Sequence, residues 1–347
     1  MANQLEMAVQ FAGNMARMSW YSGLSWMMQR QSRRFAPPVS FTPTKPVPDR
    51  KELLADLRSL LRADAQAVAQ GAMPMGHEEV TGPIEHFRRI RGMFADLPGV
   101  AERRRNRDSS TVDDVVDDDG DELPDYFKQD FHFQTGGYLS EESAKLYDIQ
   151  VETLFNGAAA AMRRKALVPL HEVMAARDQR KVSLCDVACG TGRLLKDVRR
   201  LYPAMRLTGL DLSATYLEEA QRHLGSLRKV DWLNANAEEM PLEDASQDVV
   251  TSVFLFHELP PMVRRNVACE VARILKPGGC FIFIDSLQIG DKPGWDGLLE
   301  AFPVRFHEPY YRGYAIDDLD GVFRGAGLTI ECQKLAFLSK MLVCRKP

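Results

Sequence analysis

With 347 residues, of which 45% are hydrophobic and 27% charged, the chain is long enough for more than one domain and for a sizeable buried core. A formal net charge of −4 argues against nucleic acid as a substrate. The six cysteines lack the paired spacing of a metal site, so no metal is predicted and reduced, buried thiols are expected.

The N-terminal stretch is rich in methionine and aromatic residues at helical spacing. Trp20, Leu24 and Met27 fall on one face of the predicted helix. We favour packing of this face on its own domain or on a second copy of the chain over contact of residues 1–34 with a membrane. Because no leader with a cleavage site and no run of 18 apolar residues is found, a cytoplasmic protein is predicted.

A proline-rich stretch, residues 36–48, predicts an extended linker that ends the first of three segments, residues 1–48. The second segment, residues 49–180, is expected to be a mostly helical cap. It opens on Asp49 and Glu52, which are spaced as a reciprocal capping box. Within this segment, the basic and then acidic run at 102–122 predicts a mobile loop.

Aromatic residues crowd the end of the second segment around a pair of glycines. His132 precedes Gly136 and Gly137, and Tyr138 follows them. Two interpretations stay open. The segment is either a lid that hinges at the glycines and faces the substrates, or an aromatic cluster that holds helices together.

The third segment, residues 181–347, alternates strands and helices. Strands are expected near residues 182–187, 206–211, 229–234, 248–255, 279–285, 328–333 and 337–345. The last two pair as a hairpin, so one strand should be antiparallel. The predicted fold is α/β, with a Rossmann-like, doubly wound seven-stranded sheet preceded by a mostly helical N-terminal region.

The most informative stretch runs from Leu184 to Leu195, where an apolar strand, a loop of small residues and a helix follow one another. Such a loop suits a nucleoside-bearing cofactor. A P-loop is excluded because no lysine and hydroxyl follow Gly192. A dinucleotide fingerprint is disfavoured because Leu195 stands where a third glycine belongs. Asp186, at the strand end, would repel a pyrophosphate but suits a cationic ammonium group.

A second acid, Asp211, ends the next strand, where it can accept both hydroxyls of a ribose. The motifs from Asp186 to Gly192 and from Gly209 to Ser213 resemble those of class I S-adenosylmethionine-dependent methyltransferases. Later segments match in order at residues 234–242, 246–250, 254–260 and 273–279. The resemblance covers about residues 181–347 and is nearest in style to the ubiquinone and menaquinone biosynthesis methyltransferases.

The resemblance implies S-adenosylmethionine as the cofactor and suggests which residues contact it. The methionine amino end would be held by an acid and the loop that follows it: Asp186, Ala188, Gly190 and Gly192. The ribose and adenine would meet the next strand ends: Asp211, Leu212, Asn236, Ala237 and Glu238. Phe254 would bound the methionine side.

Two positions depart from the family's pattern. Asn236 stands where an aspartate is usual, and its side-chain oxygen can still accept from the adenine amino group. Ala188 replaces a common glycine, which the loop tolerates if φ is negative there. Neither change removes the expected pocket.

Methyl transfer asks a protein mainly to orient and desolvate its substrates. His257, at the end of the fourth strand, is the first candidate for a catalytic base, although a histidine satisfied at a helix start is the structural alternative. His307, Tyr310 and Tyr311 are further candidates. The aromatic residues of 287–314 indicate a flat or apolar acceptor.

The predicted function is methyl transfer from S-adenosylmethionine to a small, apolar or aromatic acceptor. The alternative is a methyltransferase that modifies a protein, or a catalytically silent scaffold that binds a partner through its N-terminal half. A dehydrogenase is disfavoured by the missing third glycine. The expected partner is a small molecule and not nucleic acid, and a homodimer is left open.

Overall fold

The computed structural model of the chain describes residues 2–35, 40–76, 82–106, 123–129, 131–133, 136–227 and 229–347. The charged run that was expected to be mobile, residues 102–122, lies outside these ranges beyond residue 106. Its first five residues belong to the end of a helix, α3 (Pro83–Asn106).

Seven strands form one mixed sheet in the order β3-β2-β1-β4-β5-β7-β6. They are β1 (Ser183–Val187), β2 (Arg206–Asp211), β3 (Asp231–Asn234), β4 (Gln247–Val253), β5 (Leu275–Ser286), β6 (Thr329–Ala336) and β7 (Ser339–Arg345). The first five strands run parallel, whereas β7 is antiparallel to β5 and to β6. The predicted seven-stranded, doubly wound sheet with one antiparallel strand is confirmed.

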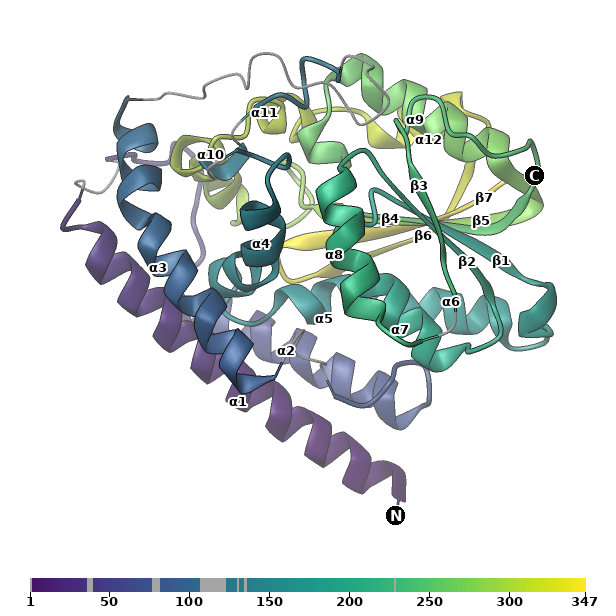
Figure 1. Ribbon diagram of the computed structural model, residues 1–347, viewed down its shortest axis with the longest axis horizontal. Coiled ribbons are helices and arrows are strands. Elements are labelled where there is room, and N and C mark those ends of the chain that lie inside the picture. The colour runs from purple at the N-terminus through teal and green to yellow at the C-terminus, as the bar shows by residue number, and fades with distance from the viewer. Residues whose placement is uncertain are drawn as a thin grey trace.

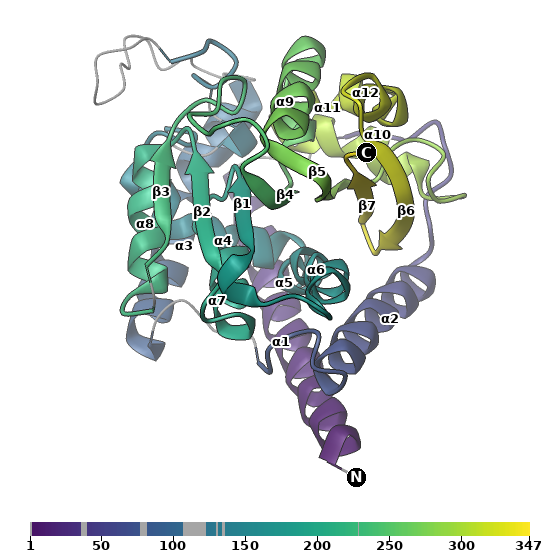
Figure 2. The same ribbon diagram turned by 90° about the vertical axis from the view of Figure 1, so that its right-hand side faces the viewer.

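Two helical layers cover the two faces of the sheet, because successive side chains of a strand point to opposite sides. Leu184 of β1 packs into one core, and Cys185 and Val187 pack into the other. Figures 1 and 2 show the two layers on either side of the strands. The first layer contains α6 (Leu167–Met174), α7 (Arg193–Leu201) and α8 (Ala214–Leu224), and the second contains α9 (Pro261–Ile274) and α12 (Leu319–Gly325).

The helices of the N-terminal half pack against this α/β unit rather than apart from it. They are α1 (Ala2–Ser32), α2 (Arg50–Ala69), α3, α4 (Glu141–Leu154) and α5 (Ala159–Arg164). A third core joins Met18 of α1 and Leu61 of α2 to Trp295 and Phe337 of the C-terminal half. Short elements complete the chain: η1 (Phe131–Phe133), η2 (Gln179–Lys181), η3 (Phe256–Glu258), α10 (Asp296–Arg305) and α11 (Tyr311–Tyr314).

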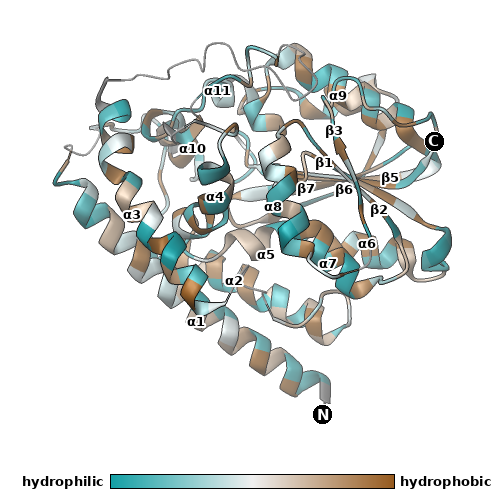
Figure 3. Ribbon diagram, viewed as in Figure 1, coloured by the Kyte–Doolittle hydropathy of each residue, from teal (hydrophilic) through white to brown (hydrophobic). Residues whose placement is uncertain are grey.

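Helix α1 packs on the chain itself through a buried polar cluster. Gln10 Nε2 and Asn14 Nδ2 donate to Asp64 Oδ2 at 2.9 and 3.0 Å, and Arg164 Nε lies 3.2 Å from Asp64 Oδ1. Brown and teal segments alternate along α1 in Figure 3. Among the helices that the structure describes, none combines the length and the apolar character needed to cross a bilayer.

The linker before α2 runs along α10. The Gly297 N–H donates to the Pro46 carbonyl at 2.9 Å. Asp49 caps α2 by accepting from the Glu52 N–H at 2.8 Å, as predicted. The reciprocal half of the capping box is absent, because the Glu52 carboxylate instead accepts from Trp295 Nε1 at 2.7 Å. The contact of Pro46 thus ties the first segment to the third, and the contact of Glu52 ties the second segment to the third.

Candidate functional site

The loop between β1 and α7 is shaped by its two glycines. Gly190 and Gly192 have φ of +53° and +72°, which glycine adopts without strain. A Cβ on Gly192 would lie only 2.9 Å from Cβ of Ala220 on α8, so glycine is required for this close approach. A Cβ on Gly190 would meet nothing within 4 Å. The Gly190 side of the loop therefore has room for a ligand.

Ala188 adopts the left-handed conformation, with φ of +56°. The condition named for tolerating alanine here, a negative φ, is therefore not met. The turn is held by the Cys189 N–H, which donates to the Leu210 carbonyl at 3.0 Å. An L-residue in this conformation costs about 1–2 kcal/mol, so the loop is strained next to the candidate site.

Asp211 joins the end of β2 to the glycine loop. Its Oδ2 accepts from the Gly190 N–H at 2.8 Å, and its Oδ1 accepts from the Ser213 N–H at 2.9 Å. Burial raises the pKa of Asp211 to about 6, although these backbone hydrogen bonds oppose the rise. Because each carboxylate oxygen has two lone pairs, Asp211 can still accept from the two hydroxyls of a ribose.

Asp186 is a buried carboxylate with few partners. Its Oδ1 accepts from Thr251 Oγ1 at 2.6 Å, which is the one hydrogen bond to this carboxylate from the part of the chain that the structure describes. Burial, together with the charge of Asp211, raises the pKa of Asp186 to about 7. The two acids and the open glycine loop thus fit the ammonium and ribose of the expected cofactor.

The turn after β3 carries three predicted residues, Asn236, Ala237 and Glu238, all half-buried. Asn236 Oδ1 accepts from the Glu238 N–H at 2.9 Å and from the Tyr126 hydroxyl at 3.3 Å. The same hydroxyl donates to Glu238 Oε1 at 2.9 Å. Tyr126, from the N-terminal half, thus lies over this turn. Sequence reasoning gave it no such role, although its place among clustered aromatic residues was a signal. Leu212, after β2, is also half-buried.

Helix α4 is anchored on the glycine loop by Asp148, which the sequence did not single out. Asp148 Oδ1 accepts from Thr191 Oγ1 at 2.9 Å, and Oδ2 accepts from Arg193 Nε at 3.0 Å. Burial would raise the pKa of Asp148, but Arg193 and His223 outweigh burial and hold it at about 2. The second segment therefore contacts the loop at which the predicted cofactor residues lie.

Aromatic residues from both halves form a cluster over the ends of β1, β2 and β4. The Tyr138 ring lies 5.2 Å from Phe131 and 5.4 Å from Tyr216, centroid to centroid. The Tyr138 carbonyl accepts from Ser213 Oγ at 2.6 Å, and its hydroxyl donates to Glu258 Oε1 at 2.5 Å. The cluster thus packs helices against one another and contacts residues that follow β2 and β4, whereas the interpretation as a lid that hinges at Gly136 and Gly137 stays a prediction.

Beside the end of β4 lies a cavity of about 200 Å³, here called the apolar cavity. Its walls come from α4, α5, α10, α11 and the turn between β6 and β7. The apolar lining residues are Tyr147, Val151, Leu154, Phe155, Met162, Phe254, Leu298, Leu299, Phe302, Phe306, Tyr311 and Leu338. Polar groups are contributed by His132, His257, Glu258, Ser286 and Arg305. This lining agrees with the flat or apolar acceptor predicted from 287–314.

Phe254 supplies part of this wall from a strained backbone, with φ of +62°. Its N–H donates to the Ile284 carbonyl at 2.8 Å, and its ring stacks on Phe155 at 6.4 Å with the planes 9° apart. The other base candidates lie differently. Tyr311 lines the cavity, whereas His307 and Tyr310 both contact Gln129 and are not among its lining residues.

His257 is held from behind by a buried acid. Its Nδ1 lies 2.6 Å from Asp285 Oδ1, and Asp285 Oδ2 also accepts from the backbone N–H groups of Phe256 and His257. Burial would lower the pKa of His257, but Asp285 and Glu258 outweigh burial and raise it to about 9. Nε2 of this imidazolium, 3.8 Å from Glu258 Oε1, is left for a molecule in the apolar cavity.

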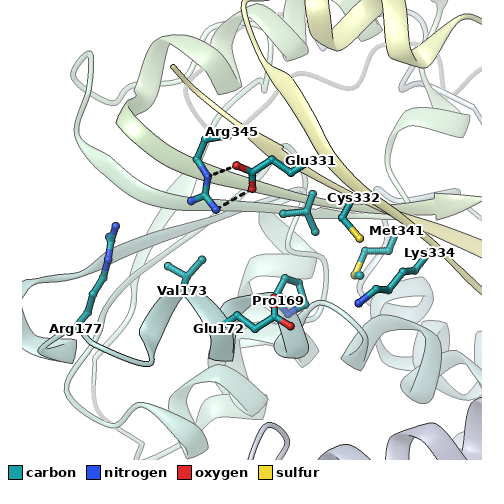
Figure 4. Close-up of a pocket in the computed structure, with 10 residues that line it drawn as sticks. Pro169, Glu172, Val173, Arg177, Glu331, Cys332, Lys334, Met341 and Arg345 are labelled. Atoms are coloured by element: carbon teal, nitrogen blue, oxygen red, sulfur yellow. Dashed lines mark hydrogen bonds and ion pairs between the residues drawn. The ribbon is translucent and has the colours of Figure 1, made fainter.

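A second cavity, of about 220 Å³, lies between α6 and the strands β6 and β7 (Figure 4). Arg345 spans its rim with bonds of 3.2 and 3.0 Å to the two oxygens of Glu331. Charged side chains such as Glu172 and Lys334 complete the lining. None of the predicted site residues lines this cavity.

Comparison with known proteins agrees with the geometry. Residues 184–279 match the family model described as "Methyltransferase domain". The chain is 33% identical over 149 residues to the demethylmenaquinone methyltransferase of Listeria welshimeri, covering 40% of this chain and 62% of that protein. It is 32% identical over 120 residues to the phthiotriol/phenolphthiotriol dimycocerosates methyltransferase 1 of Mycobacterium ulcerans, covering 35% and 43%.

The chain thus spans less than two thirds of the length of these relatives. The ubiquinone/menaquinone biosynthesis C-methyltransferase UbiE of Desulfotalea psychrophila is 30% identical over 140 residues, with 40% of this chain and 53% of that protein covered. Among solved structures, the PH0226 protein of Pyrococcus horikoshii is similar in fold. Its TM-score is 0.41 at 20% identity, and the match covers 53% of this chain and 90% of that one.

Proposed function

Because the C-terminal half carries a class I S-adenosylmethionine-dependent methyltransferase domain, we propose that the chain transfers the methyl group of this cofactor to a small, apolar or aromatic acceptor. One observation carries the proposal. Asp186 and Asp211 end adjacent strands and flank the open glycine loop, and the apolar cavity begins at the end of β4, the strand on the other side of β1.

When bound, S-adenosylmethionine supplies a methyl group on a cationic sulfur, so the protein needs no nucleophile of its own. Asp186 would bind the ammonium group as a carboxylate, because a nearby cation favours the charged form. Asp211 would accept from the ribose, and Leu212, Asn236, Ala237 and Glu238 would surround the adenine. Ala188, Gly190 and Gly192 would contribute backbone to the methionine end.

The acceptor would lie in the apolar cavity, with Phe254 between it and the methionine end. The relatives named above are demethylmenaquinone and phthiotriol dimycocerosates methyltransferases, and apolar acceptors of that kind accord with the apolar walls. His257 stays a candidate for proton handling. Because its pKa is about 9, it would meet the acceptor as a hydrogen-bond donor at neutral pH.

We also propose that residues 49–180 act as a cap on residues 181–347, with residues 1–48 as a brace. Tyr126, His132, Tyr138 and Asp148 all come from the second segment, and each contacts a residue at the carboxyl end of the sheet or in the loops around it. A partner that binds the N-terminal half would therefore bind a segment that already contacts the candidate site.

Replacing Asp211 tests the proposal. We expect S-adenosylhomocysteine to bind the wild type with micromolar affinity in calorimetric titration. Asp211→Ala should weaken binding at least about 100-fold, since two hydrogen bonds to a charged group are lost. Asp211→Asn keeps the shape of the side chain and shows whether the loop still folds. Asp231→Ala, on the exposed start of β3, is the control. Unchanged binding in both Asp211 variants would contradict the assignment.

A further inference from the structure

Five side chains form a continuous chain at the polar end of the apolar cavity, here called the two-histidine cluster. His257 Nδ1 lies 2.6 Å from Asp285, and His132 Nδ1 lies 2.7 Å from Glu308 Oε1. The remaining ring nitrogen of each histidine, Nε2, lies 3.8 Å from the same atom, Glu258 Oε1. Each ring is thus held from behind by one acid and shares Glu258 in front.

Four separate elements bring these groups together. Asp285 lies near the end of β5, and His257 and Glu258 form η3 after β4. His132 comes from η1 in the N-terminal half, and Glu308 from the loop between α10 and α11. The His132 N–H donates to the His307 carbonyl at 3.1 Å, which fixes the backbone of η1 against that loop. The cluster exists only because the second segment packs on the third.

Both histidines in the cluster carry a proton at neutral pH. Burial would lower the pKa of His132, but Glu308 and Glu258 outweigh burial and raise it to about 10. For His257 the same balance gives about 9. The acids Asp285, Glu308 and Glu258 thus face the two protonated rings. Arg305 also lines the apolar cavity, so charge alone does not keep an anion out of it.

Glu258 is the acid in this cluster with an oxygen to spare. Its Oε1 accepts from the Tyr138 hydroxyl and faces both histidines. Within the described ranges, no donor reaches its Oε2. The side chain lines the apolar cavity and is 14% exposed, whereas Asp285 and Glu308 are enclosed behind the rings. A polar atom of this kind in an apolar pocket is the natural partner for a donor on a bound molecule.

We propose that Glu258 Oε2 binds the exchangeable hydrogen of a neutral acceptor and removes that proton during methyl transfer. The acceptor is thus an apolar molecule with an O–H or N–H group at one end. This inference rests on the proposed function and deepens it. In the transfer, the X–H bond breaks and its proton goes to Glu258. Here X is the oxygen or nitrogen of the acceptor. The electron pair left on X forms the bond to the methyl carbon, and the electron pair of the broken carbon–sulfur bond stays on the sulfur of the methyl donor.

Three probes of similar size separate the relevant groups: p-cresol carries a hydroxyl, toluene carries none, and p-toluate carries a charge. Each is titrated by ligand-observed NMR into protein saturated with S-adenosylhomocysteine. Because one hydrogen bond to a charged group is at stake, we expect p-cresol to bind about 10-fold more tightly than toluene. We expect p-toluate to bind more weakly than p-cresol, because its carboxylate has no hydrogen to donate to Glu258 and loses its hydration in the apolar cavity.

The isosteric variant Glu258→Gln keeps the volume and the Tyr138 bond but loses the charge. In it, the preference for p-cresol over toluene should fall to within about threefold, and p-toluate should bind more tightly than in the wild type. Glu243→Gln, on an exposed residue before β4, should behave as the wild type. The proposal is overturned if Glu258→Gln keeps the full preference, or if p-toluate binds the wild type as tightly as p-cresol. Because binding of S-adenosylhomocysteine is measured first, its loss would instead implicate the proposed function.

Discussion

The ionisation of Asp186 is expected to link folding stability and cofactor binding to pH. Burial and the charge of Asp211 raise its pKa to about 7, so the folded protein holds this proton more tightly than the unfolded chain. In the free protein the resulting stabilisation is complete below about pH 4 and is lost as the pH rises through 7. A ligand with an ammonium group reverses this preference, because it binds the ionised form.

The affinity for S-adenosylhomocysteine should therefore rise by up to about tenfold per pH unit between about pH 5.5 and 7. Above pH 7 the affinity should level off. In Asp186→Asn the affinity should be lower, and the remaining dependence should move to the lower range where Asp211, with a pKa of about 6, titrates. Calorimetric titration at several pH values measures both. A pH-independent wild type would show that no carboxylate of this kind meets the ammonium group.

At this scale the sequence predicts the residues that end apolar strands and misses those that act across the chain. Asp186 and Asp211 follow directly from their places at the carboxyl ends of β1 and β2. Asp148 was not singled out, and His132 was named in the aromatic segment without its partner Glu308, because no local pattern marks pairs so far apart in the chain. The sequence left the sign of φ at Ala188 open, because the backbone of this loop is set by contacts such as the hydrogen bond from Cys189 to Leu210 of β2.

Helix α4 illustrates how one side chain positions a whole element. Asp148→Ala would remove the ion pair with Arg193 and the buried hydrogen bond from Thr191, so we expect the free energy of unfolding to fall by about 3 kcal/mol in urea denaturation. Amide exchange should increase along α4. Because the folded-state pKa of Asp148 is lowered to about 2, its stabilisation is present above about pH 4 and is lost as the pH falls towards 2.

Glu142→Ala, in the exposed first turn of the same helix, is the matched control and should change stability by less than about 0.5 kcal/mol. If Asp148→Ala unfolds at the same urea concentration as the control, the anchoring of α4 by this carboxylate is refuted. Both variants leave the cores untouched, so their comparison isolates the contact with the loop.

Most elements were predicted to within a few residues because their apolar periodicity is strong. The exceptions are instructive. Pro98 is expected to end a helix, yet α3 continues through it to Asn106, since Leu97 and Ala101 are buried and tertiary packing outweighs the loss of one backbone donor. β5 begins earlier than predicted, at Leu275, because that residue already pairs with Gln247 of β4.

At the scale of the whole molecule, the linker is a structural part of the α/β unit. A Cβ on Gly297 would lie 2.4 Å from the Lys45 carbonyl oxygen and 2.7 Å from Val47 Cγ2. Gly297→Ala should therefore push the linker off α10 and lower the free energy of unfolding by about 2 kcal/mol, although alanine favours helix more than glycine does. Urea denaturation followed by circular dichroism measures the change.

Gly325→Ala is the matched control, since it also lies in a helix and its added methyl would meet nothing within 4 Å. It should be neutral or slightly stabilising. Equal stability of the two variants would mean that the linker yields without cost. We expect one cooperative transition in every case, because the third core contains residues from both halves.

The three-part division of the chain stays a prediction. Composition identifies the proline-rich stretch and the charged run, but it does not predict which segments pack against one another. Met18 and Leu61 share a core with Trp295, and Trp295 also donates to Glu52. Such contacts between distant segments depend on the folded geometry, which explains why the sheet was predictable and the placement of the cap was not.

Ala188 and Phe254 both have a left-handed backbone, but replacing them with glycine would have different consequences for binding. Glycine would relax the backbone at either position. At 188 only a methyl group is given up, so thermal robustness could be gained without altering the binding surfaces. At 254 the same exchange would remove the ring that stacks on Phe155 and walls the apolar cavity. Selection for thermal stability alone would therefore favour glycine at both positions. Only the substitution at 254 would also change which molecules the apolar cavity binds.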